Sequence, residues 1–229
     1  MVEQLTDVLV YEDAVDMEKV KARRNFLYRG VKRLFDLFGA TIGLLAMFII
    51  CIPVKIMYML TGDFKSIFYT HIRVGKNGKE FYMYKFRTMV PNSKEMLEEM
   101  LNDPKYKKEW DENQKFENDP RITKVGKILR KTSLDELPQM INVLLGHMSL
   151  IGPRPLVPGE LDKHNGNHEI YERVRPGVTS WWASHGRSAT TYEERLALEY
   201  FYVQNRSLWL DIKCIFVTIK AVIMRTGAK

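Results

Sequence analysis

The chain has 229 residues, 45% of them hydrophobic and 28% charged, which is ordinary usage for one globular domain. This composition excludes a chain that is disordered throughout, a collagen and a coiled-coil fibre. Two cysteines, Cys51 and Cys214, exclude a disulfide scaffold, and both lie in apolar runs, where we expect buried reduced thiols. The net charge of +7 favours an anionic partner, either nucleic acid, anionic lipid or a phosphorylated substrate.

The charge pattern changes sign near the N-terminus. Residues 1–18 carry six acids and no Lys or Arg, whereas residues 19–33 carry seven Lys or Arg and no acid. Because no basic segment precedes an apolar stretch at the start, the sequence does not predict a secretory signal.

Residues 34–60 form the most apolar segment, interrupted only by Asp36 and Lys55. Its uncharged part, residues 37–54, would span about 27 Å as a helix, slightly less than a hydrocarbon core of about 30 Å. Three interpretations compete: a buried core helix, a helix that spans a membrane, and a re-entrant helix that enters and leaves on one face.

Two features favour the re-entrant helix. Pro53 removes a backbone donor late in the run, which predicts a kink. Basic residues flank the run on both sides, although a spanning helix should carry them mainly on its cytoplasmic side. On these features the re-entrant and spanning interpretations stand about equal, and the core helix is third.

A β segment is predicted next. Residues 66–70 and 79–89 are rich in aromatic and β-branched side chains, and residues 75–78 form a turn signal. Lys85 and Arg87 would lie on one face of the second strand. They fit either a solvated edge or a site for an anion between them.

The following stretch is highly charged. We predict a short amphipathic helix over residues 93–101 and a solvated loop over residues 102–120. Residues 122–131 read as a basic amphipathic helix, which suits a membrane surface or a phosphate site.

Residues 132–139 allow two interpretations of adjacent acids. Ser133 and Glu136 have the spacing of a helical capping box, although Pro138 would then lie inside the helix. A helix start at Pro138 is the alternative. In either case we expect the helix end to lower the pKa of Asp135 and keep it ionised. An ionised carboxylate can act as a nucleophile, and its acidic neighbour can hold Mg²⁺. On this run alone, capping is favoured.

Two arginines are braced by proline. After a predicted helix over residues 137–145, Arg154 stands between two prolines, and Arg175 precedes Pro176. A rigid loop that displays one arginine suits phosphate recognition, and a structural turn with a surface ion pair is the alternative. Residues 181–182 are tryptophans, expected in a core or interface rather than stacked on a base, and Arg187 follows them.

Taken together and in this order, the motifs resemble the bacterial sugar transferase family, the monotopic phosphoglycosyl transferases that start glycan assembly on undecaprenyl phosphate. The resemblance covers about residues 28–227. The motifs are Lys32-Arg33-Leu34-Phe35-Asp36, Lys85-Phe86-Arg87-Thr88-Met89, Ser133 to Gln139, Met148-Ser149 with Gly152-Pro153-Arg154-Pro155, and Arg175-Pro176-Gly177-Val178-Thr179.

The resemblance implies a mechanism. A nucleotide-diphosphate sugar, expected to be a UDP-sugar, would bind with Mg²⁺, and Asp135 would attack the sugar-bearing phosphorus and release UMP. Polyprenyl phosphate would then attack the aspartyl phosphosugar. Glu136 would bind Mg²⁺ and act with Asp135 in catalysis. Further residues would bind phosphate or substrate: Lys85, Arg87, Arg130, Arg154, Arg175 and Arg187.

The resemblance also implies a fold and a place in the cell. We expect a compact, mostly helical α+β domain with a re-entrant helix broken at Pro53 and interfacial helices, one over residues 208–224. The expected division is an extension at 1–28, the membrane helix at 29–61 and a catalytic domain at 62–229. The active site would lie at the cytoplasmic face of the inner membrane. Expected partners are the nucleotide sugar, polyprenyl phosphate and membrane lipid but no nucleic acid, with a homodimer left open.

The sequence departs from the family pattern at two places. The family often has Ser-Pro at the break, where this chain has Ile52-Pro53, and its Thr-Gly to Asn-Gly-Arg-Asn run reads differently over residues 179–188. The second departure leaves sugar specificity open. Two rival functions are a non-catalytic membrane adaptor, with the two acids as caps, and a single-spanning phosphohydrolase.

Overall fold

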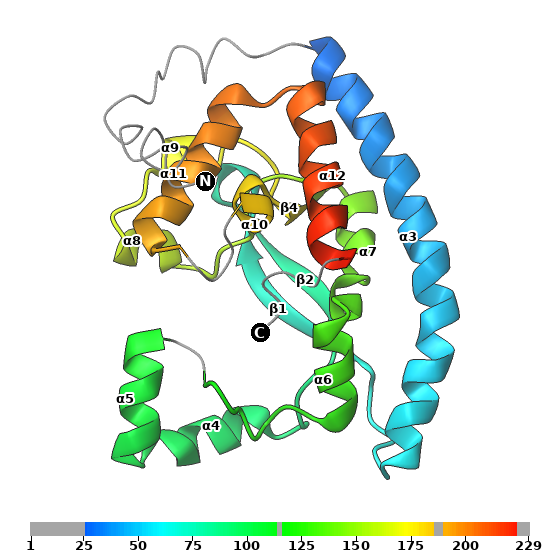
Figure 1. The fold of residues 1–229 in the computed structure, drawn as a ribbon, viewed down its shortest axis with the longest axis vertical. Coiled ribbons are helices and arrows are strands. Elements are labelled where there is room, and N and C mark those ends of the chain that lie inside the picture. Colours follow the sequence, from blue (N-terminus) through cyan, green and yellow to red (C-terminus); the bar gives the residue numbers. More distant parts are fainter. Residues whose placement is uncertain (1–25, 114–115, 186–189, 224–229) are drawn as a thin grey trace.

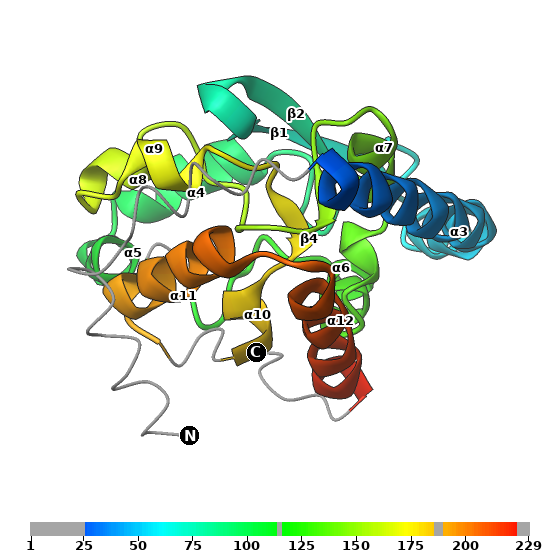
Figure 2. The ribbon, with the colours of Figure 1, turned by 90° about the horizontal axis from the view of Figure 1, so that it is seen from above.

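The computed structural model describes residues 26–113, 116–185 and 190–223 as a mostly helical molecule with two small pairs of strands. One long helix, α3 (Phe26–Leu60), runs along one side of the molecule, and the other described elements lie to one side of it (Figures 1 and 2). This confirms the expected class of a mostly helical α+β fold.

Helix α3 is the one helix within the described ranges that is long and apolar enough to cross a membrane. It continues through Pro53 to Leu60, so the proline does not end it. One stripe is buried against the other elements: Asp36, Ala40, Met47, Val54 and Tyr58. The opposite face exposes large apolar side chains, among them Phe38, Ile42, Leu45, Phe48, Ile49 and Ile52. The interpretation as a core helix therefore fits only one face of α3.

The predicted hairpin is present, with shifted bounds. Strands β1 (Phe68–Val74) and β2 (Glu80–Phe86) pair in antiparallel fashion around the short turn η1 (Lys76–Gly78). Asn77 has a left-handed φ of 59°, a conformation that asparagine tolerates better than most residues. The register pairs Tyr69 with Lys85, so this face of β1 lies beside Lys85.

The charged stretch contains a second helix. Helix α4 (Ser93–Leu101) confirms the prediction, but the loop predicted over residues 102–120 is wrong in part, because α5 (Pro104–Asn113) lies within it. Pro104 is at the first helical position, where its missing N–H costs nothing. The Asp103 side chain accepts a hydrogen bond from the N–H of Lys105 at 2.8 Å. These two signals of a helix start were overlooked, because the many charged residues of α5 suggested a solvated loop.

The acidic run is a turn between two helices. It forms η2 (Leu134–Glu136), between α6 (Lys124–Lys131) and α7 (Gln139–Leu144). Ser133 has a left-handed φ of 55°, and its side chain makes no capping hydrogen bond. The capping-box interpretation is therefore wrong, and the alternative fits, since α7 begins directly after Pro138.

A second strand pair was not predicted. Strands β3 (Ser149–Ile151) and β4 (Gly177–Thr179) are parallel and three residues long, too short to produce an alternating pattern in the sequence. Their flanking loops touch closely, because a Cβ at Gly152 would lie 2.3 Å from the carbonyl oxygen of Arg175. Glycine is therefore required where the two proline-braced arginine loops meet.

The C-terminal helices cover this strand pair. Short helices α8 (Glu160–Lys163), α9 (His168–Tyr171) and α10 (Trp181–His185) precede α11 (Tyr192–Asn205) and α12 (Leu208–Ile223). The last confirms the helix predicted from residue 208, although Met224 lies outside the described residues. Cys214 on α12 is a buried free thiol as expected, whereas Cys51 is only half-buried.

Candidate active site

The two acids of η2 face a lysine of β2. The Nζ of Lys85 lies 2.7 Å from Oε1 of Glu136 and 4.0 Å from Oδ2 of Asp135. The Asp135 side chain is 14% exposed, whereas that of Glu136 is 34% exposed. The structure thus brings together three of the residues that the sequence singled out, with Asp135 the most deeply placed of the two acids.

The pKa of Asp135 is shifted in the direction opposite to the expectation. Burial raises the pKa of Asp135 above its ordinary value, with the neighbouring Glu136 acting in the same direction and Lys85 opposing both. The expected lowering by a helix end is wrong, because Asp135 lies in a one-turn helix ahead of α7 rather than at the start of a long one. A carboxylate that is partly removed from water is less stabilised by solvent and correspondingly more reactive.

A cleft opens beside Lys85 and Glu136. Its walls come from both strands of the hairpin, from the loop around Arg154 and from the segment that joins β4 to α10. The lining residues are Arg73, Met83, Lys85, Glu136, Gln139, Arg154, Pro155, Gly177, Val178, Thr179, Ser180, Trp182 and Ala183. Three cations and few acids around one cleft suit a ligand with several negative charges.

Arg73 is a cleft residue that sequence reasoning missed. Burial and the nearby charge of Arg154 lower the pKa of Arg73 to about 10. Its Nη1 donates to the carbonyl of Pro155 at 3.2 Å, while its Nε is buried without a partner among the described residues. The first predicted strand ends at residue 70, short of Arg73. Extending it to the turn and pairing it with the second strand would have placed Arg73 on the same face as Lys85, so the register was the available signal.

Arg154 is held by its backbone, and its guanidinium is directed over an aromatic ring. The N–H of Arg154 donates to Oε1 of Glu199 at 3.1 Å, and its carbonyl accepts from the hydroxyl of Tyr171 at 2.8 Å. The guanidinium carbon lies 5.8 Å from the ring centre of Trp182. Because these bonds hold the main chain of Arg154, its guanidinium is available to bind a ligand in the cleft.

Glu199 is a second residue that the sequence did not indicate. It is fully buried on α11, and burial raises its pKa to about 7. The sequence did not predict a role for Glu199, because it lies inside an apolar helical run and its partner Arg154 comes from a distant segment.

Arg130 lies behind the acids. It lies in the last turn of α6, and its Nε donates a hydrogen bond to Oγ1 of Thr88 at 3.0 Å. Its charge also lowers the pKa of Asp135, which places it close enough to act on that carboxylate. Arg130 is therefore part of the electrostatic surroundings of Asp135 but does not line the cleft.

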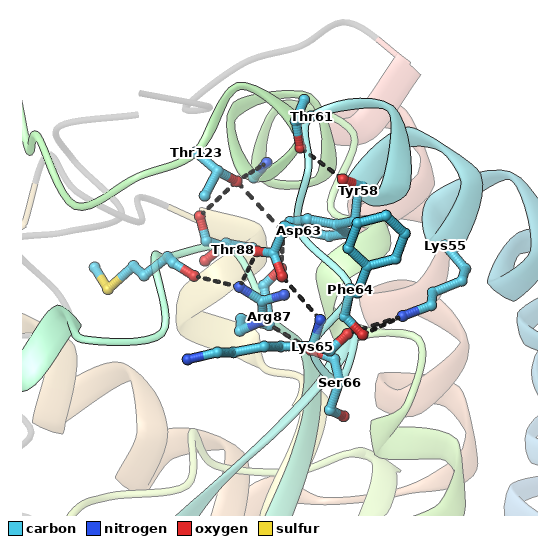
Figure 3. Close-up of polar contacts among 12 residues, drawn as sticks. Lys55, Tyr58, Thr61, Asp63, Phe64, Lys65, Ser66, Arg87, Thr88 and Thr123 are labelled. Carbon is cyan, nitrogen blue, oxygen red and sulfur yellow. Dashed lines mark hydrogen bonds and ion pairs between the residues drawn. The ribbon is translucent and has the colours of Figure 1, made fainter.

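Arg87 occupies a different place, which we call the clasp (Figure 3). Its Nη1 lies 2.7 Å from Oδ2 of Asp63, and its Nε donates to the carbonyl of Ser66 at 2.8 Å. The guanidinium also stacks on the ring of Tyr58, whose hydroxyl donates to the carbonyl of Arg87. The clasp ties the end of α3 to the end of β2 and does not line the cleft.

Of the remaining two predicted arginines, the structure describes Arg175, which does not line the cleft. Arg175 donates through Nε to the carbonyl of Gly146 at 2.6 Å and lines another cavity, near the start of α3. Arg187 lies outside the described residues.

The chemistry of the donor set suits Mg²⁺ bound together with a substrate. No group of three or more His, Cys, Asp or Glu that could hold a metal occurs within residues 26–113, 116–185 and 190–223. Mg²⁺ usually takes one or two carboxylates and completes its shell with water and substrate phosphates. Glu136, the more exposed acid, fits that role. Its ion pair with Lys85 would then have to break, and Lys85 would pair with a substrate phosphate instead.

Comparison with known proteins supports one family. The family described as "Bacterial sugar transferase" matches residues 27–225. The UDP-galactose-lipid carrier transferase of Erwinia amylovora is 47% identical over 203 residues, 87% of this chain and 42% of that protein. The undecaprenyl-phosphate galactose phosphotransferase of Salmonella typhimurium is 46% identical over 203 residues, again 87% of this chain and 42% of that protein.

A shorter relative aligns over most of its length. The exopolysaccharide production protein ExoY of Rhizobium meliloti is 42% identical over 201 residues, 86% of this chain and 87% of that protein. The chain thus spans about two fifths of the length of the first two relatives and most of the third. With the family match over nearly the whole chain and a cleft built from the same motifs, this chain belongs to the bacterial sugar transferase family.

Proposed function

We propose that the protein transfers a sugar 1-phosphate from a nucleotide-diphosphate sugar to polyprenyl phosphate. The observation that carries the proposal is the group of Lys85, Glu136, Arg73 and Arg154 that lines one cleft. Asp135 is not a lining residue but lies directly behind this wall, with Oδ2 4.0 Å from the Nζ of Lys85. A half-buried carboxylate beside a carboxylate suited to Mg²⁺ and several cations is the arrangement that phosphoryl transfer requires. The names of two relatives, a UDP-galactose-lipid carrier transferase and an undecaprenyl-phosphate galactose phosphotransferase, support the same reaction.

In the first half-reaction, a carboxylate oxygen of Asp135 attacks the phosphorus that bears the sugar. The bond from that phosphorus to the bridging oxygen breaks, and the nucleoside monophosphate leaves with the electron pair. Lys85, Arg73 and Arg154 would neutralise the phosphate oxygens, on which negative charge is concentrated. When bound, Mg²⁺ would supply further charge neutralisation at Glu136.

In the second half-reaction, an oxygen of polyprenyl phosphate attacks the same phosphorus. The bond to Asp135 breaks, the carboxylate is restored, and a lipid diphosphate sugar results. A covalent intermediate lets a water-soluble donor and a membrane-bound acceptor react in separate steps at one site. We assign the donor as a UDP-sugar and the leaving group as UMP, in keeping with the named donor of the Erwinia relative.

For α3 we propose a re-entrant or surface-bound course rather than a crossing one. Near its start, Arg33 donates to the carbonyls of Val143 and Leu144 at 2.7 and 2.9 Å. Near its end, Lys55 donates to the carbonyls of Phe64 and Lys65 at 2.8 and 3.0 Å. A crossing helix would place its two ends in different compartments, whereas both ends of α3 bind one domain. The exposed apolar face would enter the bilayer, at the cytoplasmic face of the inner membrane.

The topology can be measured in cells. Single cysteines introduced at Val2 and Gly62, in a chain with Cys51 and Cys214 replaced by serine, would be treated with a membrane-impermeant thiol reagent in intact cells and in lysed cells. We expect neither position to react before lysis and both to react afterwards. Labelling of only one position in intact cells would establish a crossing helix.

The covalent step is tested by intact-protein mass spectrometry with a UDP-sugar, Mg²⁺ and no acceptor. The wild type should gain the mass of one sugar phosphate, and addition of undecaprenyl phosphate should remove it. Asp135→Asn should show no adduct. An adduct that persists in that variant, or that maps to another residue, would disprove the assignment of the nucleophile.

The same reactions separate the rival functions. A membrane adaptor would release no nucleoside monophosphate under any condition. Without undecaprenyl phosphate, a phosphohydrolase would release it in repeated turnovers, whereas the transferase would release one equivalent per protein as the adduct forms. Repeated turnover that depends on this acceptor therefore distinguishes the transferase. A panel of UDP-sugars then identifies the sugar. The proposed place of the reaction is the first membrane step of exopolysaccharide, capsule or glycoconjugate assembly.

A further inference from the structure

A second cavity, apart from the cleft, lies beside the start of α3. Seven Lys or Arg and three acids line this open cavity of about 970 Å³. The cations are Arg29, Lys32, Arg33, Lys76, Arg173, Arg175 and Arg206. They come from α3, from the hairpin turn and from segments near α9, β4 and α11, so the fold gathers them from distant parts of the chain.

Three of these cations lack partners within the described ranges. The side chains of Arg29, Lys76 and Arg173 make no hydrogen bond or ion pair with any other described residue. Lys32, by contrast, lies 3.0 Å from Oδ2 of Asp211. Like charges repel at short range, so gathering cations that have no partner among the described residues costs free energy, which a bound anion would offset.

The acids of the cavity do not neutralise them. Asp36 accepts hydrogen bonds from Oγ of Ser149 and the N–H of Leu150, both at 2.9 Å. Glu172 lies 2.8 Å from Nδ1 of His168. Glu169 is the third acid. Two of the three acids are thus engaged elsewhere, and an excess of positive charge remains.

The cations of the cavity lower one another's pKa. Burial, together with the charges of Arg29 and Arg175, lowers the pKa of Lys76. Burial and Arg33 likewise lower the pKa of Arg175. An anion in the cavity would relieve this repulsion, and guanidinium groups match phosphate in shape as well as charge.

The position of the cavity indicates which phosphate it takes. Phe26 and Tyr28, at the start of α3, also line it, and the Phe26 side chain is exposed. If α3 lies in the membrane as proposed above, this end stands at the depth of lipid headgroups. The cavity shares no lining residue with the cleft, and β3 lines the former while β4 lines the latter. The cavity is therefore a site separate from the cleft.

We propose that this cavity is a structural lipid site that binds the phosphate of an anionic phospholipid headgroup. Basic pockets at the cytoplasmic end of membrane helices bind such headgroups by charge and by guanidinium hydrogen bonds. Bound lipid would fix the start of α3 at the surface. The proposal rests on the membrane position of α3 but not on the chemistry of Asp135.

Native mass spectrometry of the full chain in neutral detergent tests the site, with phosphatidylglycerol, phosphatidylcholine and undecaprenyl phosphate as probes. We expect one phosphatidylglycerol to be retained in preference to phosphatidylcholine. In the triple variant R29Q/K76Q/R173Q its affinity should fall about tenfold or more, as expected for the loss of charge-assisted hydrogen bonds. The single variant R173Q should show a smaller loss in the same direction.

A matched control removes the same charge elsewhere. The variant K105Q/K107Q/K108Q lies on exposed positions of α5, away from the cavity, and should retain phosphatidylglycerol as the wild type does. Equal retention by R29Q/K76Q/R173Q and the wild type would overturn the proposal. Loss of undecaprenyl phosphate alone, with phosphatidylglycerol retained, would also overturn it. Because no turnover is measured, either result leaves the proposed transferase activity to its own test.

Discussion

Lys85 and Arg87 are separated by one residue, yet they belong to different regions of the molecule. Lys85 contacts two carboxylates at the edge of an open cleft. Arg87 is enclosed in the clasp by a carboxylate, backbone carbonyls and an aromatic ring. A cation held by side-chain carboxylates at a cleft can exchange them for a phosphate. One held by backbone carbonyls is fixed by the fold, so its partners rather than its position in the motif indicate its role.

Replacing the aspartate of each region, Asp135 or Asp63, is the strongest test of this difference between the cleft and the clasp. Asp135→Asn should reduce turnover at least about a thousandfold, because the nucleophile is lost. Its melting temperature should stay near that of the wild type, since the amide keeps the size of the side chain. Steady-state UMP release and thermal unfolding of the same preparation measure both effects.

The matched variant is Asp63→Asn. It removes the carboxylate paired with Arg87 at 2.7 Å and should lower the melting temperature while the folded fraction retains turnover. If Asp63→Asn abolished turnover in folded protein, the clasp would belong to the active site and the distinction between the regions would fail.

The cations of the two regions should also differ: replacing Lys85 should reduce turnover, and replacing Arg87 should reduce stability. Lys85→Gln loses charge-assisted contacts to phosphate, worth about 1.5–3 kcal/mol, so turnover should fall about ten- to a hundredfold. Arg87→Gln breaks a largely buried ion pair and should lower the free energy of unfolding by about 3 kcal/mol. Lys79→Gln, on the exposed hairpin turn, controls for loss of one positive charge. Urea denaturation and initial rates would expose any reversal of this order.

Arg154→Ala sharpens the cleft side of the comparison. Only the side chain is removed, and the backbone bonds to Glu199 and Tyr171 remain possible. Turnover should fall about ten- to a hundredfold with little change in stability. A folded variant with normal rates would remove Arg154 from the proposed site.

Glu199 gives the smallest and most specific effect, a dependence of stability on pH. Its folded-state pKa is about 7 against an ordinary value of 4.5, so the folded chain binds the proton more tightly than the unfolded chain does. The free energy of unfolding should therefore fall as pH rises from about 4.5 to about 7. Glu199→Gln cannot ionise and should lose this component. Parallel curves for both proteins across that range would show that Glu199 does not titrate as described.

The sequence predicted those parts of the site that local patterns encode. The hairpin turn, α4 and the adjacent acids of η2 follow from turn residues, helical spacing and motif order. The raised pKa of Asp135 depends on burial, and the separate place of Arg87 depends on its partner Asp63, neither of which a local pattern shows.

The residues that were missed share a physical cause. Arg73 reaches the cleft through strand register. Glu199 does not line the cleft but accepts a hydrogen bond from the N–H of Arg154, because α11 packs against the Arg154 loop. Both depend on contacts between segments far apart in the chain. The helix α5 was missed for another reason, since its one exposed, charged surface resembles that of a solvated loop.

The inner stripe of α3 has a consequence for producing the protein in soluble form. Met47, Val54 and Tyr58 belong to the same packed cluster as Phe86 and Val125. Deleting the helix would strip this cluster of one wall and expose its apolar side chains to water, so a truncated chain should aggregate. Replacing only outward-facing side chains such as Phe38, Ile42 and Ile49 with polar ones keeps that wall intact, and is the route to a version that folds without detergent.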